Sequence, residues 1–130
     1  MILQTTLSLA AAAAVINFWL AMRIGRIRIG QKILHGDGGS PALLQRMRAQ
    51  SNFIEYTPIV LILIALIEMT TKGGTWLAIV GSVYMVGRVL HAFGMDRSDA
   101  NPMRMIGVAI TFLTMMGLAV VAVFIALGQF

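Results

Sequence analysis

Arg48-Ala49-Gln50-Ser51-Asn52-Phe53-Ile54-Glu55-Tyr56-Thr57-Pro58 is the stretch in which charged and polar residues run into a strongly apolar segment. The apolar segment continues to Ile67 with no further charge. A carboxylate or guanidinium in hydrocarbon is costly unless it is paired or faces a polar cavity. Charged residues at this position therefore predict a functional site inside a membrane-embedded helix bundle.

A helical conformation would bring the polar residues of this stretch onto one face. Arg48, Asn52 and Glu55 stand at i, i+4 and i+7, within about 60° of one another at 100° per residue. Gln45 and Tyr56 border the same face. The competing interpretation is a helix-packing network in which Glu55 neutralises an arginine of a neighbouring helix. Four polar residue types in one stripe favour a binding site over that alternative.

Composition indicates an all-α integral membrane protein. Of the 130 residues, 58% are hydrophobic and 12% are charged, and the mean hydropathy is +0.86, far from the balance of soluble proteins. The net charge of +5 does not predict nucleic-acid binding, because the basic residues flank apolar runs as they do in cytoplasmic loops. The chain has no cysteine, so any thiol chemistry must use the thiol of a substrate.

Four apolar segments predict one domain, residues 1–130, that forms a four-transmembrane-helix bundle. The expected helices cover residues 2–22, 41–71, 75–94 and 102–127, and each can cross roughly 30 Å of hydrocarbon at about 1.5 Å per residue. Ser40-Pro41 and Asn101-Pro102 each combine an N-cap residue with proline at the first helical position. A cleavable signal peptide is the rival for the first segment, but no basic residue precedes it.

Basic residues predict the orientation of the bundle. Arg23, Arg26 and Arg28 follow the first apolar segment, and Lys72 is the only basic residue between the second and third segments. The positive-inside rule then places the first and third connections in the cytosol and both termini on the outer side.

Three further ionisable residues lie near the same membrane depth as Arg48. Arg104 falls in the first turn of the fourth expected helix, where the macrodipole favours an anion, so a bound thiolate would explain a cation there. A snorkelling arginine that contacts lipid phosphate is the alternative. Arg88 and His91 are i, i+3 partners that would join the same cytoplasm-facing pocket, with interfacial anchoring or packing as their alternatives. The two histidines have no metal-ligand spacing, so no metal is expected.

The central stretch resembles a family signature. Arg48-Ala49-Gln50-Ser51-Asn52-Phe53-Ile54-Glu55-Tyr56-Thr57-Pro58 is similar to the pattern Arg-Ala-x-x-Asn-x-x-Glu-Tyr-x-Pro of the membrane-associated proteins in eicosanoid and glutathione metabolism, abbreviated MAPEG. Length, four spans and a basic first cytoplasmic loop agree along the whole chain. The resemblance implies a homotrimer with glutathione at the subunit interfaces, near the cytoplasmic face, and lipophilic substrates that arrive from the bilayer.

The resemblance also implies residue roles. Glutathione-binding positions by the motif are Arg48, Gln50, Asn52, Glu55 and Tyr56. Arg104 matches the arginine proposed to stabilise the thiolate, with Arg97 as a competitor for that role. A basic residue at the end of the first helix contributes in the family, and here Arg23, Arg26 and Arg28 are equivalent candidates for it. His91 and Met95 stand where eicosanoid-making members carry tyrosines, which argues against leukotriene-type substrates.

Three functions are compatible with these features. The leading hypothesis is a glutathione transferase that conjugates glutathione to lipophilic electrophiles, with glutathione peroxidase activity as a second reaction. The alternative is a non-catalytic lipid-binding or scaffold protein of the same fold. A small multidrug exporter would carry a glutamate in its first helix, and this chain has none there. Similarity to short bacterial members implies a multi-pass protein of the bacterial inner membrane.

Overall fold

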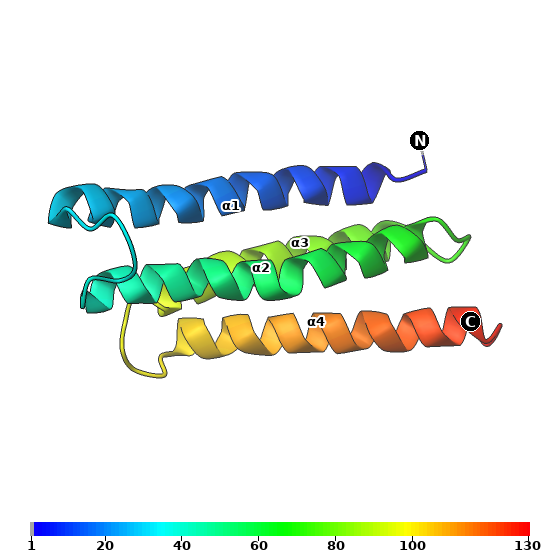
Figure 1. The fold of residues 1–130 in the computed structure, drawn as a ribbon. Helices are drawn as coiled ribbons and strands as arrows, with labels where there is room; N and C mark the ends of the chain where they lie inside the picture. The colour runs from blue at the N-terminus through cyan, green and yellow to red at the C-terminus, as the bar shows by residue number, and fades with distance from the viewer. Residues whose placement is uncertain (1) are drawn as a thin grey trace.

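The computed structural model describes residues 2–130 and contains four antiparallel α-helices (Figure 1). Their bounds are Gln4–Gln31 for α1, Pro41–Glu68 for α2, Thr75–Gly94 for α3 and Pro102–Ala126 for α4. No strand occurs in this part of the chain, and all four helices are long and apolar enough to cross a membrane. The predicted four-helix membrane fold is therefore confirmed, and both ends of the chain lie at the same end of the bundle (Figure 1).

Helix α1 is longer than the sequence analysis predicted. It was expected to end near residue 22 and instead continues to Gln31. The expectation equated the end of the apolar run with the end of the helix, but no proline interrupts the chain there and isoleucines keep an apolar face. The helix stops only at Lys32, which adopts a left-handed conformation with φ 56°. As a result, Arg23, Arg26 and Arg28 lie on the helix and not in a loop.

Two capped helix starts are confirmed. The Ser40 hydroxyl accepts a hydrogen bond from the Leu43 amide at 3.2 Å, and the Asn101 side-chain carbonyl accepts one from the Arg104 amide at 3.1 Å. Proline follows each cap at the first helical position. Side-chain caps of this kind satisfy amides that have no partner inside the helix. Arg104 is thereby fixed in the first turn of α4, as the sequence predicted.

Helices α3 and α4 pack closely because glycines face the partner helix. A Cβ added at Gly94 would lie 2.3 Å from the Arg104 backbone nitrogen, and one added at Gly107 would lie 2.6 Å from the His91 Cβ. Small residues of this kind let membrane helices approach until their backbones are in contact. The close approach sets the position of Arg104 relative to His91.

Polar contacts hold α1 against the bundle at both ends. At the end that carries the termini, the Glu68 carboxylate accepts hydrogen bonds from the Thr5 and Thr6 amides at 2.8 Å each. At the other end, Arg23 pairs with Asp96, and its guanidinium carbon lies 4.9 Å from the Trp19 centroid and 5.5 Å from the Phe93 centroid. A carboxylate at a helix N-terminus and a cation over aromatic rings are both favourable arrangements.

Candidate functional site

A small cavity opens among α2, α3 and α4, at the end of the bundle away from the termini. Its volume is about 150 Å³, and it is lined by residues of the three helices: Arg48, Asn52, Glu55, His91, Met95, Arg104 and Val108. Five of these, namely Arg48, Asn52, Glu55, His91 and Arg104, are predicted site residues. The helical spacing of the central stretch explains why its three members share one wall.

The charged groups of the cavity are not neutralised within one chain. Within residues 2–130, no hydrogen bond or ion pair is formed by the side chains of Arg48, Glu55 or Arg104. Arg48 and Glu55 are exposed on the surface of the single chain, and Arg104 is half-buried. Two guanidinium groups and one carboxylate therefore remain available to a ligand that carries both anionic and cationic groups.

Arg88 lies behind the cavity wall instead of lining it. Its side chain is 2% exposed and donates hydrogen bonds to the Asn52 side-chain carbonyl and the Thr111 hydroxyl. Its guanidinium nitrogen Nη2 is also 3.3 Å from His91 Nδ1. The Thr111 hydroxyl in turn donates to the Gly107 carbonyl at 2.8 Å. Arg88 thus connects α2, α3 and α4 and fixes the orientation of Asn52 in the cavity.

Thr111 is the residue of this network that the sequence analysis missed. α4 contains two threonines, Thr111 and Thr114, and neither carries a charge or matches a motif, so local pattern gives no reason to select Thr111. Its hydrogen bond to the Gly107 carbonyl could be predicted from the sequence, because the hydroxyl of a helical threonine commonly donates to the carbonyl four residues before it. The partnership with Arg88 depends on tertiary packing.

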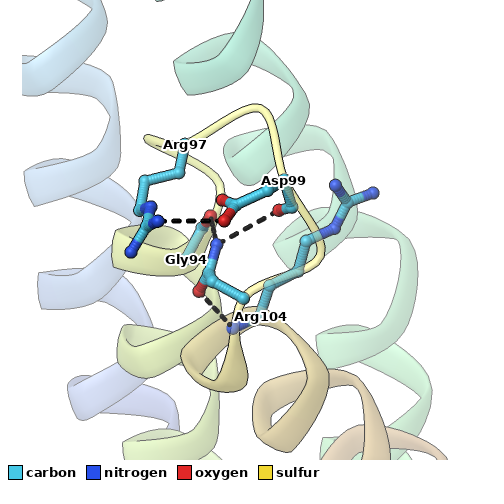
Figure 2. A network of polar contacts seen from close by, with 5 residues as sticks. Gly94, Arg97, Asp99 and Arg104 are labelled. Carbon is cyan, nitrogen blue, oxygen red and sulfur yellow. Dashed lines mark hydrogen bonds and ion pairs between the residues drawn. The ribbon is translucent and has the colours of Figure 1, made fainter.

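The orientation of Arg104 separates it from its competitor Arg97. Arg97 pairs with Asp99 at 2.9 Å, and both side chains are exposed in the loop. Figure 2 shows the Arg97 and Arg104 side chains pointing to opposite sides of the loop. Asn101 donates to the Gly94 carbonyl at 2.7 Å and to the Asp99 carbonyl at 3.2 Å. Of the two arginines, only Arg104 lines the cavity.

The remaining three predicted site residues lie outside the cavity of the single chain. Gln50 turns to α1 and donates to the Asn17 side chain at 3.2 Å, as expected of a residue two positions from Arg48 on a helix. Tyr56 packs edge-on against Phe112, with ring centroids 5.6 Å apart. Arg28 donates to the Gly36 carbonyl at 2.9 Å.

Comparison with known proteins identifies the family. The sequence model of the MAPEG family matches residues 6–124. The inner membrane protein YecN of Escherichia coli strain K12 is 33% identical over 90 residues, which cover 65% of this chain and 68% of YecN. YecN of Escherichia coli O6:H1 matches to the same extent. The chain therefore belongs to the MAPEG family and is a multi-pass membrane protein.

Proposed function

We propose that the cavity binds glutathione and that the protein transfers its thiolate to lipophilic electrophiles. The observation that carries this proposal is the convergence of Arg48, Asn52, Glu55 and Arg104 on one cavity. Glutathione carries two carboxylates, one ammonium group and one thiol. Guanidinium groups match the carboxylates, and the Glu55 carboxylate matches the ammonium group.

The size of the cavity supports a site that is shared with a neighbouring subunit. Its 150 Å³ is about half the lower end of the usual range for small-molecule sites, roughly 300 Å³. Arg48 and Glu55 are exposed at its mouth, so a neighbouring subunit at this surface would enlarge and close the site. We propose that three copies assemble in this way and that each interface holds one glutathione.

The reaction requires activation of the thiol and proximity to the second substrate. The thiol proton passes to water, and the thiolate sulfur forms a bond to the electrophilic carbon while the leaving group departs with its electron pair. Arg104 and the N-terminus of α4 both favour the thiolate. Lowering the thiol pKa by about two units from its reference near 8.5 raises the thiolate fraction at neutral pH over tenfold.

Lipophilic substrates would reach the thiolate from the bilayer. Met95 and Val108 form the apolar part of the cavity lining, next to the polar groups that would hold glutathione. A hydroperoxide would react in the same place: two glutathione molecules are oxidised to the disulfide, while the hydroperoxide is reduced to an alcohol and water. We place the protein in the inner membrane, with the cavity near the cytoplasmic face, where glutathione and bilayer-dissolved substrates meet.

Two measurements on purified protein in detergent test the proposal. Isothermal titration with glutathione should give saturable binding that Arg48→Ala and Glu55→Ala both weaken. A conjugation assay with an aryl halide should then give a glutathione-dependent product. No binding by the wild-type protein would contradict the proposal as a whole. Saturable binding without turnover of an aryl halide or an organic hydroperoxide would contradict its catalytic part.

A further inference from the structure

The last turns of α1 carry a surface that lies outside the cavity proposed to hold glutathione. Residues 4–22 of α1 already span roughly 28 Å at 1.5 Å per residue, which is close to the thickness of the hydrocarbon core. Residues 23–31 continue the helix past this depth, and the end of α1 projects beyond the adjacent ends of α3 and α4 (Figure 1). This segment therefore lies at the level of the lipid headgroups.

The projecting end combines exposed aliphatic side chains with a hollow. Ile29 is 82% exposed and Leu34 is 85% exposed, more than any other large hydrophobic residue of the described chain. They border a hollow of about 440 Å³ together with Arg28, Lys32 and Ile33. Aliphatic side chains this exposed beside a membrane predict contact with lipid or with another protein.

Two basic residues, Arg28 and Lys32, line this hollow, and Arg26 lies earlier on the same helix. Arg28 is held beside it by hydrogen bonds to the Ile33 and Gly36 carbonyls at 3.4 and 2.9 Å. Neither Arg26 nor Lys32 takes part in an ion pair within residues 2–130, and both are exposed. The first acidic residue of the chain is Asp37, whose carboxylate accepts the Gly39 amide of its own turn at 3.0 Å.

We propose that this hollow binds an anionic phospholipid of the adjacent leaflet. The lipid phosphate contacts Lys32 and Arg28, Arg26 adds long-range attraction, and the upper acyl chain packs against Ile29 and Leu34. An amphiphile with a negative headgroup is the partner whose chemistry matches aliphatic and cationic groups side by side at this depth. The inference does not depend on glutathione binding.

Native mass spectrometry of the full-length protein tests the inference. The protein is equilibrated in mixed micelles with equal amounts of phosphatidylglycerol and phosphatidylcholine that carry identical acyl chains. The wild-type protein should retain phosphatidylglycerol preferentially. The double variant Arg26→Gln/Lys32→Gln should lower this preference by about fivefold for each cation removed. Lys72→Gln, which removes a cation at the opposite end of the bundle, should leave the preference unchanged.

A second variant pair tests the aliphatic contribution. Ile29→Ser/Leu34→Ser keeps every charge and should reduce retention of both lipids. Three results would overturn the proposal. The first is equal retention of both lipids by the wild-type protein, and the second is retention of added inorganic phosphate as strong as that of phosphatidylglycerol. The third is a changed oligomer mass in Arg26→Gln/Lys32→Gln with unaltered lipid retention, which would assign the surface to a second copy of the chain.

Discussion

Arg104 and Arg88 illustrate two uses of an arginine inside a membrane protein. Arg104 is half-buried in the first turn of α4, and its side chain has no partner among residues 2–130. Arg88 is fully buried, donates to Asn52 and Thr111, and lies behind the cavity wall. In the proposed site the first arginine would contact the ligand, whereas the second fixes the orientation of Asn52 in the cavity wall.

Replacing Arg104 should affect thiolate formation more than ligand binding. In Arg104→Gln the cation that favours the thiolate is lost, while the N-cap of α4 is made by the backbone amide and persists. We expect the ultraviolet absorbance of bound thiolate at neutral pH to fall about tenfold, with a smaller change in glutathione affinity.

Arg97→Gln is the matched control, because it removes a nearby arginine that pairs with Asp99 outside the cavity. It should leave thiolate absorbance unchanged. Normal thiolate formation in Arg104→Gln would remove this residue from the mechanism.

Replacing Arg88 should weaken glutathione binding although Arg88 does not line the cavity. Arg88→Met leaves the Asn52 and Thr111 oxygens without the guanidinium donor. The loss should lower the free energy of unfolding by about 1–3 kcal/mol, and Asn52 loses the contact that fixes its orientation in the cavity. We expect a roughly tenfold loss of glutathione affinity by titration calorimetry.

A double-mutant cycle distinguishes positioning from general destabilisation. If Arg88 acts through Asn52, then Asn52→Ala/Arg88→Met should bind glutathione about as well as Asn52→Ala alone. Fully additive losses would show that Arg88 acts by another route.

At the scale of helices, the position of Arg104 depends on how closely α3 approaches α4. Gly94 lies against the Arg104 backbone, and Asn101 joins the end of α3 to the start of α4 through the Gly94 carbonyl. These contacts are between backbone and small or capping groups, which have little freedom to adjust. A change of one methyl group at this crossing should therefore be transmitted to the cavity.

Gly94→Ala should displace the first turn of α4. The added Cβ would lie 2.3 Å from the Arg104 nitrogen and 2.6 Å from its Cα, so the backbone must move. This movement should lower the free energy of unfolding by about 1–3 kcal/mol. We expect a lower melting temperature in detergent and weaker glutathione binding.

Gly117→Ala provides the control on the same helix pair. A Cβ at Gly117 meets nothing within 4 Å, and alanine is favoured over glycine in a helix by up to about 1 kcal/mol. This variant should match or exceed the wild-type melting temperature. Equal effects of the two substitutions would contradict the close-packing explanation.

Local sequence pattern predicted the elements better than their contacts. The caps at Ser40 and Asn101 were predictable because a side chain, a proline and an apolar run adjoin one another in the sequence. The end of α1 was not, since hydropathy falls at Arg23 while the backbone remains helical. The partners of Glu68 and Arg88 lie 62 and 36 positions away, respectively, at Thr6 and Asn52, and such pairings depend on helix packing that no local pattern records.

At the scale of the whole molecule, the single chain leaves its polar face incomplete. Arg48 and Glu55 are exposed in a helix apolar enough to span a membrane, where unpaired charges are costly. Gln50, a motif position, contacts α1, and Arg28, a candidate for the basic residue at the end of the first helix, contacts the following loop. A second subunit against α2 would shield the charges and add to the cavity wall.

Native mass spectrometry should therefore give a mass three times the 14.1 kDa of one chain. The trimer should persist in mild detergent and dissociate in sodium dodecyl sulfate, which provides the monomer reference in the same experiment. Glutathione should bind only to the trimer, because the cavity of one chain is too small and too open. A monomer that retains wild-type glutathione affinity would contradict the shared site.

Asn101 has a consequence for how the protein is made. Its side chain accepts a hydrogen bond from the Arg104 amide and donates one to the Gly94 carbonyl. These backbone groups at the turn between the last two spans are therefore already paired and do not have to be desolvated separately. We expect α3 and α4 to leave the translocon as one preassembled hairpin. Substitution of Asn101 should then slow membrane insertion of the nascent chain, in addition to removing the cap on the first turn of α4 in the mature protein.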